Sequence, residues 1–329
     1  MVIYDRLRST KYDQLLYQMI EHGPGSFYVH PMEINEILDK AFCIFSAEET
    51  LLELEAPTVI IGDLRGQYCD FFRWLKLTGF PPKQQILILG GFFDGTICGS
   101  IELLVFIAAL KVALPYNFFV IRGVTEFIGV DLKRGFSRRV CADLSSAALR
   151  MFSQMPLAAV ISQKILCVHS GISPRIKSFK SISSIKRPIV DLTCSKIVLD
   201  LLFNLPDPTI QSTKPIQSGH GHFFGESVVD QVLNRLDLEL IVRGRNSSPQ
   251  GYFLFNNRRV LTLWSAIGRD TSFGVVAVVE KNLEITLKRI QTEEKVVAKT
   301  CPKDTLTETQ SVGQSVEGQE STQPKSNKL

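Results

Sequence analysis

Three polar turns in the first half of the chain hold the side chains that could do chemistry. They are residues 62–66 (GDLRG), 90–94 (GGFFD) and 122–126 (RGVTE). Among them are the carboxylates of Asp63 and Asp94, the guanidinium of Arg65 and the hydroxyl of Thr125. Each turn directly follows a short apolar run, and in α/β sheets the reactive groups lie on loops beyond the strand ends. We therefore expect the three turns to meet at one site.

The apolar runs before these turns are predicted to be buried strands. They are residues 58–61 (TVII), 86–89 (ILIL) and 118–121 (FFVI), and helical patterns at 68–77 and 100–114 separate them. This alternation favours a layered α/β core. Further helices are predicted at 12–21, 32–49, 145–155 and 226–235, and a loop at 173–187. Further strands are predicted at 161–168, 238–242, 252–255, 260–264, 273–279 and 283–290.

The composition is that of an ordinary soluble globular protein, with 45% hydrophobic and 21% charged residues in 329. A net charge of +4 on scattered basic residues gives no reason to expect nucleic acid. The longest apolar stretch, 103–114, is too short to span a membrane. Charges in residues 1–11 argue against a signal peptide, and seven irregularly spaced cysteines suit reduced thiols. We expect a cytoplasmic or nuclear protein.

The chain is expected to contain one domain and a tail. Residues 1–290 have the apolar patterns described above, whereas residues 291–329 contain no aromatic residue and are rich in Ser, Thr, Gln, Glu and Lys. Such a segment buries too little apolar surface to offset its ordering entropy. The tail is therefore predicted to be disordered.

Together with residues 168–171 (VHSG), the three turns resemble degenerate forms of the phosphoprotein phosphatase signatures GDxHG, GDxVDRG, GNHE and HGG. Further segments are most similar to the type-1 protein serine/threonine phosphatases, namely 51–57 (LLELEAP), 66–68 (GQY), 79–82 (GFPP) and 261–266 (LTLWSA). The resemblance extends from about Tyr4 to about Ile290. It implies a metallophosphoesterase-like fold, a layered α/β/β/α sandwich.

Active members of this family hold two divalent metals, of the manganese or iron/zinc type, which activate a water molecule for attack on phosphorus. The resemblance implies that Asp63 and His169 are the remaining ligands, and that other ligand positions are occupied by Arg65, Gly91, Val124 and Arg245. Glycine and valine offer no ligand atom, and a guanidinium stays protonated and repels a cation. We therefore expect no cofactor, although Asp63 and His169 could hold a single ion weakly.

The resemblance also implies that the groups acting beside the metals are missing. Thr125 stands at the position of the family's general-acid histidine, and a hydroxyl has no useful pKa near neutrality. Asp94 remains at the position of the carboxylate that supports that histidine. The arginines that clamp the phosphate in relatives align with Gly95 and Ser218.

The two arginines at metal-ligand positions lead to a hypothesis about charge. Unpaired buried carboxylates are costly, so Arg65 and Arg245 could replace the metals as partners of Asp63 and Asp94. In one alternative, both arginines lie on a solvated loop surface. In another, they form a phosphate-binding pocket.

Type-1 phosphatases recruit regulatory proteins through an apolar groove that accepts an extended R-V-x-F peptide. The resemblance assigns this groove to Leu240, Leu254, Leu261, Leu263, Leu283, Ile285 and Leu287. These residues could equally be apolar because the strands are buried. Of the acidic rim, Asp237 and Glu239 are present, and Lys281 replaces an acid.

Together, these observations favour a catalytically inactive homologue of the protein serine/threonine phosphatases. It would bind regulatory proteins with R-V-x-F-type motifs or phosphoproteins, but neither nucleic acid nor membranes. The alternative is an enzyme with residual metal-dependent hydrolysis of phosphoserine and phosphothreonine. Asp63, Asp94 and His169 would then be its surviving parts.

Overall fold

The computed structural model describes residues 10–95, 97, 99–127, 142–217, 220–268 and 271–292. One compact unit extends over Met1–Val296. From residue 293 onward the predicted tail lies outside the described residues, and Gln291, where we expected the tail to begin, ends a strand. No helix in the described ranges combines the length and the hydropathy that a membrane span requires.

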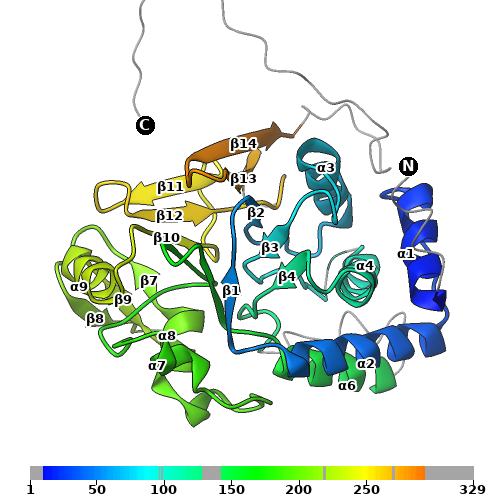
Figure 1. Ribbon diagram of the computed structural model, residues 1–329, viewed down its shortest axis with the longest axis horizontal. Helices are drawn as coiled ribbons and strands as arrows, with labels where there is room; N and C mark the ends of the chain where they lie inside the picture. Colours follow the sequence, from blue (N-terminus) through cyan, green and yellow to red (C-terminus); the bar gives the residue numbers. More distant parts are fainter. Residues whose placement is uncertain are drawn as a thin grey trace, which may run out of the picture. The chain divides into compact units, whose positions relative to one another are not determined.

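The three predicted apolar runs form the parallel part of a five-stranded sheet (Figure 1). They are β2 (Thr58–Ile61), β3 (Ile86–Ile88) and β4 (Phe118–Val120), in which Ile60 pairs with Leu87 and Leu87 with Phe119. The antiparallel strand β13 (Phe273–Val279) pairs with β2, and β14 (Ile285–Gln291) forms the edge beyond it. Because β2, β3 and β4 are parallel, the turns that follow them lie at the same edge of the sheet.

A six-stranded sheet has the order β1-β5-β6-β10-β12-β11. Its strands are β1 (Leu51–Leu54), β5 (Ala158–Ile161), β6 (Ile165–Val168), β10 (Leu240–Arg243), β11 (Tyr252–Phe255) and β12 (Val260–Leu263). The prediction of one strand over 161–168 is wrong, because Ser162 and Gln163 have positive φ, 46° and 56°, and reverse the chain. A hairpin results, in which Ile161 pairs with Ile165.

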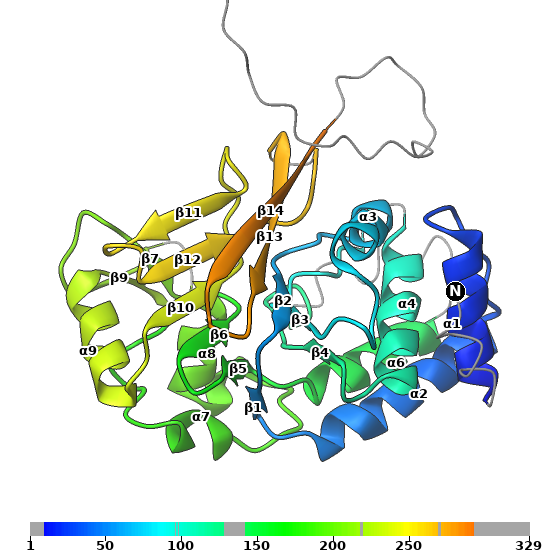
Figure 2. The ribbon, with the colours of Figure 1, turned by 45° about the horizontal axis from the view of Figure 1, so that its top comes forward.

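The two sheets pack face to face, with helices on both outer faces (Figure 2). The five-stranded sheet is covered by α1 (Lys11–His22), α2 (Pro31–Ala47), α3 (Tyr68–Thr78), α4 (Ser100–Ala113) and α6 (Ala142–Ser153). The six-stranded sheet is covered by α7 (Lys180–Ser183), α8 (Lys196–Phe203) and α9 (Glu226–Leu236). The fold is therefore the expected α/β/β/α sandwich. However, α7 lies within the segment predicted to be a loop.

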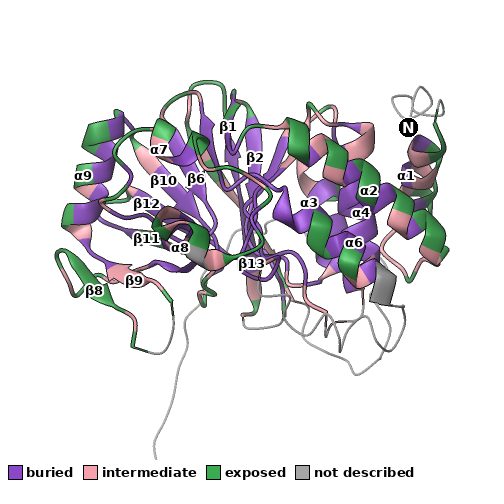
Figure 3. Ribbon diagram, turned by 90° about the horizontal axis from the view of Figure 1, so that it is seen from below, coloured by how far each residue is buried: buried purple, intermediate pink, exposed green. Residues whose placement is uncertain are grey.

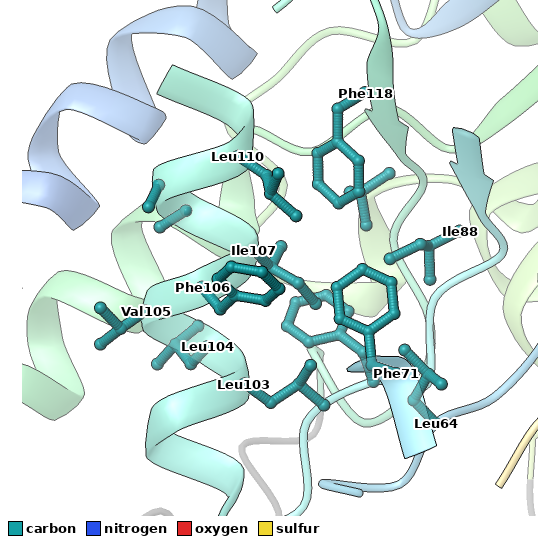
Figure 4. Packing of buried hydrophobic residues seen from close by; sticks show 14 of the residues in the cluster. Leu64, Phe71, Ile88, Leu103, Leu104, Val105, Phe106, Ile107, Leu110 and Phe118 are labelled. Carbon is teal, nitrogen blue, oxygen red and sulfur yellow. The ribbon is translucent and has the colours of Figure 1, made fainter. Parts of the chain in front are cut away.

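Burial follows these layers. The strands are largely buried, whereas most helices expose one face (Figure 3). The helix α4 is an exception, since its residues from Leu103 to Leu110 are all buried. Figure 4 shows Phe106 of this helix beside Phe71 of α3, with Phe118 of β4 nearby, and the Phe71 and Phe106 ring centroids are 5.9 Å apart. This packing supports the sheet edge that carries the three turns.

The fold also contains a small third sheet and a disulfide-bonded cysteine. A three-stranded sheet contains β7 (Leu205–Pro206), β8 (Thr213–Pro215) and β9 (His222–Phe224). The expectation of reduced thiols holds for Cys43, Cys167 and Cys194 but not for Cys69, which is disulfide-bonded. Spacing along the sequence does not reveal which thiols the fold brings together.

Candidate functional site

The three predicted turns lie against one another beyond β2, β3 and β4. The backbone N–H groups of Leu64 and Arg65 donate to the carbonyl of Gly91, at 3.1 and 2.9 Å. Gly90 has φ +83°, and a Cβ at this position would lie 2.4 Å from the backbone nitrogen of Gly123. Only glycine therefore lets the second and third turns approach this closely. The prediction that the turns meet at one site is confirmed.

The carboxylate of Glu126 holds the second and third turns together. Glu126 is fully buried, and it accepts hydrogen bonds from the backbone N–H groups of Gly91, Phe93 and Gly123, each at 2.9 Å. It also accepts one from the hydroxyl of Thr125 at 2.8 Å. The Thr125 hydroxyl, which we expected at the position of a general acid, thus donates to a carboxylate within the protein.

Asp63 is the second fully buried carboxylate of the site. Its Oδ2 accepts a hydrogen bond from Nε of Arg65 at 2.9 Å, and its Oδ1 accepts one from the backbone N–H of Arg245 at 2.7 Å. Burial raises the pKa of Asp63, and the Arg65 cation opposes this shift. The Asp63 carboxylate thus has a cationic partner that belongs to its own turn.

His169 lies beside Asp63 as a neutral imidazole. Its Nδ1 is 2.9 Å from the carbonyl oxygen of Leu89, and because a carbonyl only accepts, Nδ1 carries the proton. The same nitrogen is 3.9 Å from Asp63 Oδ1. Burial lowers the pKa of His169 to about 3. Its Nε2 is buried and has no hydrogen-bond partner within the described ranges.

The guanidiniums of Arg65 and Arg245 lie over aromatic rings. The Cζ atom of Arg65 is 5.3 Å from the ring centroid of Trp264, and that of Arg245 is 5.6 Å from the ring centroid of Phe203. Arg65 forms the ion pair with Asp63, whereas Arg245 reaches Asp63 through its backbone N–H. Both arginines are half-buried. The hypothesis that Arg245 also pairs with a site carboxylate through its side chain gains no support from these contacts.

Asp94 is half-buried at the end of the second turn. Its backbone carbonyl accepts a hydrogen bond from the hydroxyl of Ser100 at the start of α4. The preceding Phe92 and Phe93 are buried, and both rings contact Phe152 of α6, with centroids 5.9 and 5.8 Å apart. The second turn is therefore held by helices on both sides of Asp94.

Sequence reasoning missed Arg243 as part of the site. This arginine ends β10 and is fully buried, and burial lowers its pKa to about 9. It donates to the carbonyl of Ser170, to Thr262 Oγ1 at 2.9 Å and to Asn246 Oδ1 at 2.7 Å. The only signal in the sequence was a charged residue ending an apolar strand.

The seven apolar residues assigned to a regulator groove differ in how far they are buried. Leu261 and Leu263 are buried in the apolar cluster between the two sheets. Leu240, Leu283, Ile285 and Leu287 are half-buried and pack against the same cluster, whereas Leu254 is 37% exposed. Leu254 lies on β11, the edge strand of the six-stranded sheet, and Ile285 and Leu287 lie on β14, the edge strand of the other. Leu254 is nevertheless the register partner of Leu261 on β12, so the structure places all seven residues near one another.

Comparison with known proteins identifies the family. Residues 56–244, more than half of the chain, match the model of calcineurin-like phosphoesterases. The chain therefore belongs to the calcineurin-like phosphoesterase family.

Two solved structures show the same fold. A protein serine/threonine phosphatase from Saccharomyces cerevisiae, described as similar to human phosphatase PP5, matches with a TM-score of 0.73 and 22% identity. The match covers 83% of this chain and 94% of that one. A cold-active protein-tyrosine phosphatase of a Shewanella species matches with a TM-score of 0.54 and 17% identity, over 75% of this chain and 84% of that one. The sandwich is therefore that of a metallophosphoesterase.

The divalent metals of this family do not fit the residues present here. No cluster of three or more His, Cys, Asp or Glu side chains able to hold a metal occurs among the described residues. A Cβ at Gly91 would lie 2.2 Å from Asp63 Oδ2, so a bridging carboxylate at this position would collide with Asp63. Val124 is 5% exposed and belongs to an apolar cluster, and Arg65 already binds the Asp63 carboxylate. We therefore derive no metal-dependent step for this site.

Proposed function

We propose that this chain is a calcineurin-like phosphoesterase that no longer hydrolyses phosphate esters and acts as a binding module for regulatory proteins or phosphoproteins. One observation carries the proposal. The buried Asp63 carboxylate, a ligand position in the family, forms a 2.9 Å ion pair with Arg65. A cation that cannot leave the protein thus neutralises the carboxylate that a metal would need.

The contacts around this ion pair reinforce the proposal. Gly91 leaves the space in which Asp63 and Arg65 meet, since any Cβ there would displace the carboxylate. Thr125 donates to Glu126 and is not available as an acid for a leaving group. Loss of several parts that act together leaves little catalytic power to any single survivor.

The first experiment measures metal content and turnover of the full chain. Protein purified from manganese-supplemented medium is analysed for metals, and its hydrolysis of a phosphoserine peptide is measured with added manganese. An active phosphoprotein phosphatase prepared in the same way is the positive control. We expect less than stoichiometric metal and no turnover above that of Asp63→Ala. Two metals per chain, with turnover that Asp63→Ala abolishes, would show that the protein is an enzyme.

The binding part of the proposal rests on the edge strand β14. Among the described residues, β14 pairs only with β13, so its other edge can accept an extended peptide. Leu283, Ile285 and Leu287 are half-buried beside this edge, and Thr286 is exposed. Alternation of half-buried apolar and exposed side chains gives such a peptide both hydrogen-bonding groups and apolar contacts.

A matched pair of variants tests this surface. Fluorescence anisotropy with a labelled R-V-x-F peptide measures affinity for the wild-type chain, Leu287→Asp and Thr286→Asp. We expect Leu287→Asp to weaken binding at least about tenfold, because a charge replaces a half-buried apolar contact, and Thr286→Asp to change it little. Equal affinities for all three chains would place the peptide elsewhere and refute the groove.

A further inference from the structure

Within the described part of the chain, Arg65 and Arg245 leave most of their guanidinium donors without an acceptor. A guanidinium carries five N–H donors. Arg65 uses only its Nε, which donates to Asp63, and the Arg245 side chain donates to no described residue. Since both side chains are half-buried rather than fully exposed, water does not surround these donors completely. The two side chains together therefore present a set of strong donors at the site.

Arg122, Arg187 and Arg243 differ from these two arginines, because each donates through all three of its guanidinium nitrogens. Arg122 donates to the carbonyls of Glu126 and Ile189, and Arg187 donates to the carbonyls of Phe45, Glu48 and Gln154. Arg243 also donates through its Nε and both terminal nitrogens. These three guanidiniums are therefore held within the protein at every nitrogen, unlike those of Arg65 and Arg245.

The backbone at both positions is unusual. Arg65 has φ +48° and Arg245 has φ +77°, in the left-handed region that residues with a Cβ seldom occupy. Strain of this kind persists where the surroundings impose it, and it is common at binding sites. Here the Asp63 carboxylate imposes it, because it accepts both Nε of Arg65 and the backbone N–H of Arg245. Asp63 thus fixes the guanidinium of Arg65 directly and the backbone, from which the Arg245 side chain projects, through its N–H.

Several cations lie around the buried Asp63. Arg65, Arg243 and Arg245 all act on its carboxylate. Arg65 and Arg245 also repel each other, and this repulsion adds to burial in lowering the pKa of Arg245. An anion between them would relieve the repulsion and satisfy the free donors.

We propose, on the basis of the function proposed above, that Arg65 and Arg245 bind the phosphate group of a ligand without any metal. Two N–H groups of one guanidinium can donate to two oxygens of the same phosphate. The rings of Trp264 and Phe203, which lie under the guanidiniums of Arg65 and Arg245, help to keep these guanidiniums in place. The phosphate belongs either to a phosphorylated protein or to a free small molecule. This donor set differs from the family's, because Gly95 stands at one of its phosphate-clamp positions.

Isothermal titration calorimetry on the full chain in EDTA tests the proposal. The probes are inorganic phosphate, a phosphoserine peptide and the same peptide without phosphate, at constant ionic strength. We expect saturable binding of the two phosphorylated probes only. Arg65→Gln and Arg245→Gln should each weaken it about tenfold or more, because each removes charge-assisted hydrogen bonds. Arg259→Gln, which alters a half-buried arginine paired with Asp230, should leave it unchanged.

Two further variants keep the test decisive if a glutamine variant unfolds. Arg65→Lys and Arg245→Lys retain the charge but lose the fork, so they should fold and still bind phosphate more weakly than wild type. Binding of inorganic phosphate without binding of the peptide would support the site and identify a free ligand. Absence of saturable phosphate binding, or equal affinity in wild-type and folded arginine variants, would overturn the proposal.

Repeating the titration with added manganese, and checking the peptide for hydrolysis, distinguishes failure of this inference from failure of the proposed function. If phosphate binds only after manganese is added and the peptide is hydrolysed, the protein is an enzyme and both proposals fail. If phosphate does not bind under either condition and no hydrolysis occurs, only the inference fails. Binding in EDTA with the phosphopeptide recovered intact supports both.

Discussion

Asp63 and Glu126 are both fully buried carboxylates at one site, but the protein stabilises them in different ways. Glu126 accepts hydrogen bonds from three backbone N–H groups and one hydroxyl, all from its own or a neighbouring turn. Asp63 depends on a side chain, the guanidinium of Arg65, and on one backbone N–H. Backbone donors are fixed by the fold, whereas a side-chain partner can be replaced by mutation. The fold itself therefore stabilises Glu126, whereas the stabilisation of Asp63 depends on the identity of one side chain.

The largest effect is expected when Glu126 is removed. Glu126→Ala leaves three buried backbone N–H groups without their acceptor, and we expect the free energy of unfolding to fall by about 4 kcal/mol. Guanidinium chloride denaturation measures the change. The control is Asp39→Ala, which removes an exposed ion pair with Arg150 and should cost less than about 0.5 kcal/mol. A similar small loss for both variants would show that Glu126 does not hold the turns together.

A smaller loss is expected when Asp63 loses its partner. Arg65→Gln leaves a buried carboxylate without its cation, and we expect a destabilisation of about 3 kcal/mol. Asp63→Asn should recover part of this loss in the Arg65→Gln background, because the unpaired charge is then gone. The double-mutant cycle is measured by the same denaturation experiment. Additive effects of the two substitutions would mean that the ion pair contributes nothing.

Asp70 of α3 is a third buried carboxylate, and it has fewer partners than the other two. It accepts a hydrogen bond from the backbone N–H of Ile267 at 2.7 Å, and Arg73 lies 3.6 Å away. Burial raises its pKa from 3.8 to about 6. Because the folded state binds this proton more tightly than the unfolded chain, Asp70 contributes stability at low pH that is lost as pH rises from about 4 to about 6.

Asp70→Asn should therefore stabilise the protein above pH 7, by about 2 kcal/mol, because the neutral amide still accepts from Ile267. The variant should also lack the part of the pH dependence between about 4 and 6 that Asp70 contributes. Denaturation curves collected across this range for both chains measure the difference. Parallel curves would show that Asp70 titrates at its ordinary value.

Local sequence patterns predicted the strands and the place of the turns, but not the side-chain contacts between distant segments. The apolar runs before the turns predicted β2, β3 and β4, and the shared direction of these strands predicted that Asp63 and Glu126 lie at one edge. The contacts of Arg243 with Ser170 and Thr262 could not be predicted, because these residues belong to separate segments that only the fold brings together. The hairpin of β5 and β6 was missed because its turn, Ser162-Gln163-Lys164, contains none of the Gly, Asn or Asp residues that usually mark a hairpin turn.

The smallest effect is expected at Thr125, and it tests whether Glu126 depends on side chains at all. Thr125→Val removes the one hydroxyl that donates to Glu126 and keeps the shape of the residue, so we expect a loss of about 1 kcal/mol. Thr125→Ser keeps the hydroxyl and is the matched control. If Thr125→Val cost as much as Arg65→Gln, the hydroxyl would be as important to Glu126 as the guanidinium is to Asp63. The distinction between a carboxylate fixed by the backbone and one held by a side chain would then be lost.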